Sequence, residues 1–420
     1  MKTVERINRH NVEIEAPPSK AHTLRAIILA SLADGKSVIR NPLLGDDQLH
    51  LIDCMKKLGV EIKALKDELE ITGVNGRFKV LDPVLDAGES GVSMNVLCAL
   101  GSLGDAALTL TGAEGLLKRP VDQVVEGMRQ LGCQIEYMNA PGFPPLKIQP
   151  TGIVGGTAKI SGRKTSQYFS SITLASPLAQ NPVQLECKDI LTERPYYDIT
   201  TTMMEKFGVA VENNNYSRMR VPNDRGYSAC DIDVEGDYSS ASFFFLAAAI
   251  CKSTVTVKRL VPDSVQGDKA FLGLMKRMGC GVFQNETEVT VTGNDLSAIQ
   301  TDMKDIPDLV PCVAVACAYA KGKSILTGVG HLRNKECDRL EAMREGLDRM
   351  GVECGYDEDS MWIVGTDKMH AAEINPYNDH RIAMSFAVAG LPFGGQVIQD
   401  ETCVKKSFPD FWDRFAVFHG

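Results

Sequence analysis

The sequence lacks an apolar run long enough to span a lipid bilayer. Its longest apolar stretches, residues 243–250 and 309–320, are shorter than the roughly 18–20 residues that a membrane helix requires. The N-terminal residues show no apolar segment followed by a small-residue cleavage site, as a secretory signal would. We therefore expect a cytoplasmic protein.

The sequence also lacks an excess of positive charge. The 420 residues include 45 Lys and Arg against 54 Asp and Glu, which gives a formal net charge of −9. This balance argues against nucleic acid or an anionic membrane as the main partner, because both require broad basic surfaces. Small anions are possible ligands wherever basic residues are concentrated locally.

The twelve cysteines form no CxxC pair. The closest two, Cys312 and Cys317, lie among Ala and Val and are expected to be buried thiols, as in a protein of a reducing compartment. The seven histidines show no metal-binding pattern, so no metal is expected. An apolar fraction of 44% and the chain length suit a globular protein of two or three domains, and we expect a monomer.

An internal repeat of about 70 residues runs along the chain. Five segments, from "MKKLGVEI" to "LDRMGVECG", combine the end of an amphipathic helix, a capping Gly and an alternating strand. Six others, such as "ILASLADGKSVIRN", combine an Ala-rich helix with a β-branched strand. The capping glycines are 71–76 residues apart: Gly59, Gly132, Gly208, Gly279 and Gly351.

These two kinds of segment, taken as the halves of one repeat, predict six α/β repeats arranged in two domains of three repeats each. The sixth repeat ends with the helix "FPDFWDRFAVF", so we expect "TVERINRHNVEIEA" near the N-terminus to supply its missing strand. One domain would comprise residues 20–234, and the other residues 1–19 with 235–420. Two hinged domains would form a ligand-binding cleft. A repeat scaffold that binds proteins is the alternative, but its repeats are commonly about 20–50 residues long.

Small and polar residues precede the Ala-rich helices, as in "PPSKAHTLR", "GESGVSMN" and "GRKTSQYF". Helix N-termini of this kind attract anions through their open backbone N–H groups. Loops after the strands add basic side chains at similar positions of several repeats: Arg119, Arg194, Lys405 and Lys406. Each alone would be a solvated surface charge, but their recurrence indicates an anion site.

The ordered motifs resemble the EPSP synthase branch of the enolpyruvyl transferase family. The resemblance covers nearly the whole chain and is carried by "PSK", "RPY", "GDYSSASFF", "DIPD", "KECDR", "NDHRIAM" and "KKSFPDF". It implies an α/β fold, a two-domain inverse α/β barrel of six βαβαββ repeats. It also implies transfer of the enolpyruvyl group of phosphoenolpyruvate to the 5-hydroxyl of shikimate 3-phosphate, without a cofactor, on the route to chorismate and aromatic amino acids. The branch that acts on a UDP-amino sugar is disfavoured, because it has Asn where Ala21 follows Lys20.

The resemblance also implies roles for individual residues. Glu336 would handle the methylene proton of the donor, Asp308 the hydroxyl proton of the acceptor, and Lys20 could act as an acid at the bridging oxygen. "HLRNKECDRLEAM" would be a catalytic loop entering a helix, with Arg333 and Asp338 in structural ion pairs. Guanidinium groups suit the carboxylate and phosphate of the donor. The residues implied for phosphoenolpyruvate are Lys20, Gly91, Arg119, Gln167, Arg339, Arg381 and Lys406, and those for the acceptor are Arg25, Thr165, Ser166, Gln167, Tyr196, Asp308 and Lys335.

The chain departs from the family pattern on the acceptor side. Ala21 replaces the usual Ser, and Glu193 replaces the Ser expected before Arg-Pro-Tyr, so a carboxylate would face the acceptor phosphate. Glu89 stands where the family usually has Asn, and Asn95 stands where it usually has Arg. Two alternatives therefore stand beside the main interpretation. One is an enolpyruvyl transferase for another hydroxylated ring, and the other is a non-catalytic ligand-binding homologue, although Lys20, Asp308, Glu336 and Arg381 are all present.

Overall fold

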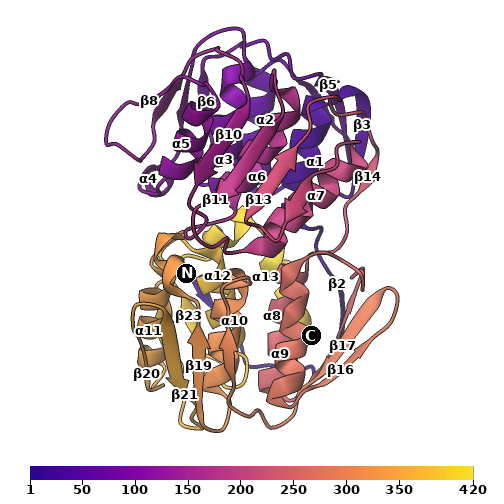
Figure 1. Ribbon diagram of the computed structural model, residues 1–420. Coiled ribbons are helices and arrows are strands. Elements are labelled where there is room, and N and C mark those ends of the chain that lie inside the picture. The colour runs from indigo at the N-terminus through magenta and orange to yellow at the C-terminus, as the bar shows by residue number, and fades with distance from the viewer. Residues whose placement is uncertain (420) are drawn as a thin grey trace. The chain divides into compact units, whose positions relative to one another are not determined.

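The structure is a computed structural model, and it describes residues 1–419. It divides the chain into two compact units. The continuous unit is Pro18–Val234, and the discontinuous unit joins Met1–Pro17 to Glu235–Gly420. The first boundary thus follows Pro17, two residues before the position that the sequence suggested. Figure 1 follows the chain through both units by colour.

Each unit contains three sheets, and five of the six sheets have four strands. The third sheet of the continuous unit shows the pattern, with the order β10-β11-β13-β12. Its first two strands run parallel and the other neighbours are antiparallel. Along the chain this repeat reads β10 (Gly156–Ile160), α6 (Gln167–Ala175), β11 (Val183–Cys187), α7 (Arg194–Lys206), β12 (Glu212–Asn214) and β13 (Arg218–Val221). This is the expected βαβαββ repeat.

The N-terminal segment serves two sheets of the discontinuous unit. Strand β1 (Lys2–Thr3) pairs antiparallel with β23 (Val397–Ile398), which confirms that this segment completes the sixth repeat. Strand β2 (Asn11–Glu15) instead pairs parallel with β15 (Thr254–Lys258), so it opens the fourth repeat. Figure 1 shows β2, in indigo, in the sheet that holds β16 and β17. The sequence predicted the first pairing and missed the second.

The continuous unit closes in a similar way. Its last strand, β14 (Ile232–Asp233), pairs parallel with β3 (Asp34–Arg40) and so supplies the first strand of the first repeat. The remaining elements of this unit are α1 (Lys20–Leu32), α2 (Asp46–Lys57), β4 (Glu61–Ala64), β5 (Glu68–Val74), β6 (Val84–Asp86), α3 (Gly91–Leu100), β7 (Leu108–Thr111), α4 (Glu114–Leu117), α5 (Asp122–Gln130), β8 (Ile135–Tyr137) and β9 (Leu146–Ile148).

The capping glycines behave as their spacing predicted. All five adopt a positive φ, between 83° and 114°, at or just after the end of a helix. A side chain is strained in this left-handed region, whereas Gly adopts it freely and lets the chain turn into the next strand. The five are Gly59, Gly132, Gly208, Gly279 and Gly351.

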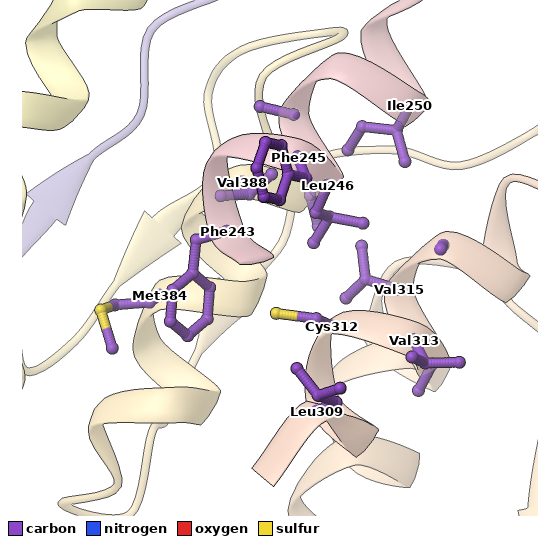
Figure 2. Packing of buried hydrophobic residues seen from close by; sticks show 14 of the residues in the cluster. Phe243, Phe245, Leu246, Ile250, Leu309, Cys312, Val313, Val315, Met384 and Val388 are labelled. Carbon is purple, nitrogen blue, oxygen red and sulfur yellow. The ribbon is translucent and has the colours of Figure 1, made fainter. Parts of the chain in front are cut away.

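Three apolar helices form the centre of the discontinuous unit. They are α8 (Tyr238–Cys251), α10 (Val310–Ala318) and α12 (His380–Ala389), and nearly every residue in them is buried. A helix that is apolar on all sides must be covered by neighbours. Phe243, Cys312 and Met384, one from each of these helices, belong to the same buried cluster, part of which is seen in Figure 2. Cys312 and Cys317 are buried thiols, as expected. This rigid cluster fixes the N-terminal ends of the three helices, where polar residues are placed.

Among residues 1–419, none of the helices combines the length and the apolarity that a membrane span requires.

The other elements of the discontinuous unit surround the cluster formed by α8, α10 and α12. The elements are α9 (Ala270–Met278), β16 (Gly281–Gln284), β17 (Glu288–Thr292), β18 (Gln300–Asp302), β19 (Lys323–Thr327), α11 (Arg339–Arg349), β20 (Cys354–Tyr356), β21 (Ser360–Val364), β22 (Glu373–Ile374) and α13 (Phe411–Phe415), with short 3-10 turns η3 (Gly267–Lys269), η4 (Pro307–Leu309), η5 (Gly330–Asn334) and η6 (Thr402–Lys406).

Candidate active site

Arg339, the first residue of α11, is the centre of a buried charge cluster in the discontinuous unit. Only 1% of its side chain is exposed. Its guanidinium group contacts three carboxylates: Asp379 at 2.7 Å, Glu336 at 2.7 Å and Asp308 at 2.8 Å. Burial disfavours the charged form of Arg339, but Asp379, Glu336 and Asp308 hold its pKa well above the usual value. Arg339 is therefore a permanent buried cation.

Asp308 joins Arg339 to a second arginine. It lies in η4, just before the buried helix α10, and Arg381 Nη2 donates to its Oδ2 at 2.9 Å. Burial opposes the ionised form of Asp308, yet Arg381 and Arg339 hold its pKa well below the usual value, with a further contribution from Lys335. Arg381 Nη1 also donates to Ser239 Oγ at 2.5 Å. Asp308 is thus ionised, and it accepts hydrogen bonds from both arginines.

Glu336 lies between two cations. Its Oε2 contacts Arg339, while its Oε1 contacts Lys406 Nζ at 2.8 Å. Lys406 belongs to η6 and is buried, as is Arg381. The structure therefore brings together Asp308, Lys335, Glu336, Arg339, Arg381 and Lys406, all of the predicted site residues that the discontinuous unit contains.

The continuous unit holds the other predicted residues at the starts of its apolar helices. Lys20, the first residue of α1, contacts Asp47 Oδ2 at 2.6 Å and is one-fifth exposed. One turn later, Arg25 donates to Thr200 Oγ1 at 2.7 Å and to the carbonyl oxygens of Ala21 and Tyr196. Burial lowers the pKa of Arg25 to about 10, partly opposed by Tyr196. These contacts hold Arg25 without the Ser that Ala21 replaces.

Gly91, Arg119 and Gln167 lie close together. A Cβ atom added at Gly91 would lie 3.4 Å from Gln167 Oε1 and 3.7 Å from Arg119 Nη1. Arg119 Nη2 lies 3.6 Å from Glu89 Oε2, one of the residues that depart from the family pattern. Asn95 Nδ2 donates to Gln167 Oε1 at 3.2 Å. One donor, Arg119 Nη1, and one acceptor, Gln167 Oε1, therefore lie beside the Gly that begins α3.

Glu193 is a buried carboxylate of the continuous unit. It precedes α7 in a left-handed conformation with a φ of 56°, and only 1% of it is exposed. Its Oε2 accepts a hydrogen bond from Thr165 Oγ1 at 2.5 Å, and its carbonyl oxygen accepts one from Ser166 Oγ at 2.9 Å. The hydroxyls of Thr165 and Ser166, both predicted to bind the acceptor, therefore already donate to Glu193.

The sequence-based prediction was wrong about Arg333 and Asp338. Arg333 donates to the carbonyl oxygens of Glu358 and Asp357, and Asp338 caps α11 by accepting from the backbone of Leu340 and Glu341. Neither makes an ion pair among the described residues. Both stabilise the loop, but through backbone groups, because each lies where a turn leaves carbonyl or N–H groups unpaired.

The helix N-termini are also less open than the sequence suggested. The side chains of Ser19, Ser90, Asp237 and Asp379 each accept a hydrogen bond from the first turn of the helix that they precede. These caps satisfy part of the backbone donor set. Recognition of an anion therefore rests mainly on the side chains described above.

Sequence reasoning missed three buried carboxylates. Asp379 and Asp47 are the partners of Arg339 and Lys20. Asp268, in η3, is 95% buried and bonds to Ser239. Burial raises the pKa of Asp268 to about 7, assisted by Asp308 and Asp237 and opposed by Arg381 and Ser239. Asp379 had a signal in "NDHRIAM", where an Asp precedes an apolar helix, but the role of Asp268 depends on contacts between distant segments.

Comparison with known proteins agrees with this geometry. The family model for EPSP synthase (3-phosphoshikimate 1-carboxyvinyltransferase) matches residues 4–415. A 3-phosphoshikimate 1-carboxyvinyltransferase of Methanoculleus marisnigri is 40% identical over 95% of this chain and 94% of its own. One from a Shewanella species is 36% identical over 97% of each chain.

Solved structures show the same fold. EPSP synthase from Acinetobacter baumannii superposes with a TM-score of 0.83 and 27% identity, over 98% of this chain and 96% of that one. The fold is the two-domain inverse α/β barrel of those structures. The chain therefore belongs to the EPSP synthase (3-phosphoshikimate 1-carboxyvinyltransferase) family of transferases.

Proposed function

We propose that the chain transfers the carboxyvinyl group of phosphoenolpyruvate to the 5-hydroxyl of shikimate 3-phosphate and releases inorganic phosphate, a step of aromatic amino acid biosynthesis in the cytoplasm. The observation that carries this proposal is the cluster in which Arg339 and Arg381 share Asp308 while Glu336 joins Arg339 to Lys406. It combines fixed cations for an anionic donor with two carboxylates for proton transfer. Twelve thiol cysteines suit the reducing environment of the cytoplasm.

Each unit carries basic groups suited to the donor. In the discontinuous unit Arg339, Arg381 and Lys406 supply hydrogen-bond donors from buried positions. In the continuous unit Arg119 Nη1 supplies one beside Gly91, where Gln167 also lies. Guanidinium groups bind carboxylate and phosphate oxygens in pairs, which orients the donor as well as attracting it. Since these cations are preorganised by carboxylates in a buried cluster, they stabilise the charge that develops on the leaving phosphate.

Protons move in two places. Asp308, held ionised by two arginines, accepts the proton of the acceptor's 5-hydroxyl as its oxygen attacks C2 of the donor. Glu336, which is paired with Arg339 and Lys406 before the donor binds, takes up a proton from solvent once the anionic donor engages these cations, and delivers it to the methylene carbon. Loss of a proton from the resulting methyl group to the Glu336 carboxylate, with departure of phosphate, restores the double bond. Lys20, 20% exposed, is the acid at the bridging oxygen.

The acceptor is held by the remaining predicted residues. Arg25 has the charge for its carboxylate, and Lys335, Thr165, Ser166 and Tyr196 have donors for its phosphate and hydroxyls. The continuous unit holds Arg25 and Tyr196 together through a hydrogen bond to the Tyr196 carbonyl oxygen at 2.9 Å. We further propose that the protein is a monomer, which light scattering at several concentrations tests.

One observation favours a second candidate. Thr165 Oγ1 and Ser166 Oγ already donate to Glu193, whose carboxylate would repel an acceptor phosphate. Repulsion between unit charges about 4 Å apart is worth about 1 kcal/mol in water and several times more near a protein. An enolpyruvyl transferase for a hydroxylated ring without that phosphate fits this arrangement.

The test is phosphate release from phosphoenolpyruvate by the purified protein, with and without shikimate 3-phosphate. Release that depends on the acceptor supports the proposed function. Calorimetric binding of phosphoenolpyruvate without release would support the second candidate and direct the search to unphosphorylated cyclic alcohols. Absence of both binding and release would exclude the two candidates together.

A further inference from the structure

Arg25 differs from the other buried arginines in the charge of its partners. Arg339 and Arg381 each contact at least one carboxylate. Arg25 is buried too, but its side chain donates to neutral oxygens and makes no ion pair among residues 1–419. A buried cation without a counter-ion is unfavourable, and burial accordingly lowers the pKa of Arg25. The position therefore suits an anion that comes from outside the chain.

Three neutral partners hold the guanidinium group of Arg25 from two helices. Its Nε donates to Thr200 Oγ1 at 2.7 Å and its Nη2 to the carbonyl oxygen of Tyr196 at 2.9 Å, both in α7. Its Nη1 donates to the carbonyl oxygen of Ala21, one turn earlier in α1, at 3.0 Å. An arginine has five N–H groups, so one remains on Nη1 and one on Nη2. Such a pair matches the two oxygens of a carboxylate.

Thr200 is the partner of Arg25 that depends on a side chain. The other two are backbone carbonyls, which every residue type provides. Thr200 is fully buried, and its Oγ1 also lies 3.1 Å from Ser170 Oγ in α6 and 3.0 Å from the Tyr196 carbonyl oxygen. A hydroxyl has one hydrogen and two lone pairs, so it can accept from Arg25 while it donates to one of these groups. The Thr200 hydroxyl thereby ties Arg25 to the packed helices of the continuous unit.

A purely local role explains only part of these contacts. A Thr within a helix often bonds to the carbonyl oxygen four residues earlier, as Thr200 does with Tyr196. The bond from Arg25 is different, because it joins residues 175 positions apart and supplies the acceptor that a buried Nε needs. Val would fill the same space without that acceptor. Packing alone therefore does not account for the hydroxyl at this position.

We propose that Thr200 is a positioning residue that orients the Arg25 guanidinium group toward the carboxylate of the acceptor. The inference rests on the proposed function, which assigns Arg25 to that carboxylate. Thr200 itself touches no substrate. Its role is to fix the two remaining N–H groups of Arg25, in a chain where Ala21 replaces the usual Ser.

The experiment measures kcat and the KM of both substrates for Thr200→Val, with Thr201→Val as the matched control. Both variants lose a Thr hydroxyl from α7, but Thr201 donates to the carbonyl oxygen of Asp198 instead. We expect Thr200→Val to raise the KM for shikimate 3-phosphate roughly 10- to 100-fold, the range for one hydrogen bond to a charged group. The KM for phosphoenolpyruvate should change much less, and Thr201→Val should leave both values near those of the wild type.

Further variants separate positioning from packing. Thr200→Ser keeps the acceptor, so its KM for shikimate 3-phosphate should stay within a few-fold of the wild-type value even if its melting temperature falls. Thr200→Cys, whose sulfur is a weaker acceptor, should give an intermediate KM and replaces the Val variant if that protein does not fold. In an Arg25→Lys background, Thr200→Val should add little, because Lys has no Nε to hold.

The outcomes distinguish this inference from the proposed function. A wild-type KM for shikimate 3-phosphate in Thr200→Val, an equal rise in the KM of both substrates, or an undiminished effect in the Arg25→Lys background would overturn the positioning role. Absence of turnover by the wild-type protein with shikimate 3-phosphate would instead refute the proposed function.

Discussion

Asp268 makes the stability of the discontinuous unit depend on pH in an unusual direction. Burial raises its pKa to about 7 from an ordinary value of 3.8. The folded state therefore binds a proton that the unfolded chain releases, so this carboxyl stabilises the fold at low pH and loses that contribution as the pH rises toward 7. Most buried ion pairs of Asp act in the opposite sense.

The size of the effect follows from the shift. A difference of one pKa unit corresponds to 1.36 kcal/mol. Between pH 5 and pH 8, ionisation of Asp268 should thus lower the free energy of unfolding of the wild-type protein by about 3 kcal/mol, since this carboxyl ionises in the folded state only near pH 7. Asp268→Asn removes the titration and keeps the shape. The free energy of unfolding of the variant, measured relative to that of the wild type, should therefore rise by about 3 kcal/mol from pH 5 to pH 8.

Urea unfolding at pH 5, 6, 7 and 8, followed by circular dichroism, measures this difference. Comparing the two proteins at each pH cancels the groups that titrate identically in both. Asp308 does not titrate in this interval, because Arg381 and Arg339 hold its pKa well below the usual value. A constant difference between variant and wild type over the four pH values would refute the reasoning, whatever the size of that difference.

The remaining predictions concern turnover, specificity, folding and shape. Glu336→Gln should abolish phosphate release yet leave phosphoenolpyruvate binding measurable by calorimetry; turnover near the wild-type rate would contradict its proton-transfer role. Glu193→Ser should lower the KM for shikimate 3-phosphate several-fold, because it removes a repulsive carboxylate and releases Thr165; an unchanged KM would show that the acceptor phosphate does not approach this residue. Asp379→Asn should reduce the free energy of unfolding by roughly 3–5 kcal/mol, since it removes one partner of the buried Arg339, and urea denaturation would detect this. Saturating both substrates should lower the radius of gyration in solution scattering, because the two hinged domains that the sequence predicts would close on bound ligands; an identical value with and without substrates argues against closure.

The repeat architecture was predictable because its signals are local. Each capping glycine marks the point where an amphipathic helix turns into a strand, and all five adopt the left-handed backbone that this turn needs. The pairing of β2 was not predictable in the same way. A five-residue alternating strand such as Asn11–Glu15 fits several sheet edges equally well, and only the folded unit selects β15 as its neighbour.

The candidate site was likewise predictable only in part. The motifs that carry the family resemblance singled out Asp308, Glu336, Arg339 and Arg381, and the structure places these four residues in one cluster. Their counter-ions were not apparent. Asp47 and Asp268 lie in segments with no motif, and the bond between Thr165 and Glu193 joins residues 28 positions apart. Such partners follow from packing rather than from spacing along the chain.

The two-sheet role of the N-terminal segment affects how the protein folds during synthesis. The continuous unit has all of its strands once residue 234 has emerged, so it can fold while translation continues. The strands in residues 1–17 are synthesised before the strands with which they pair. β2 pairs with β15, and β1 pairs with β23, which lies almost 400 residues further along the chain. At about 5–20 residues per second, the delay between the synthesis of β1 and that of β23 is roughly 20–80 s. During this time the nascent chain carries an unpaired N-terminal strand although every strand of the continuous unit has already been synthesised.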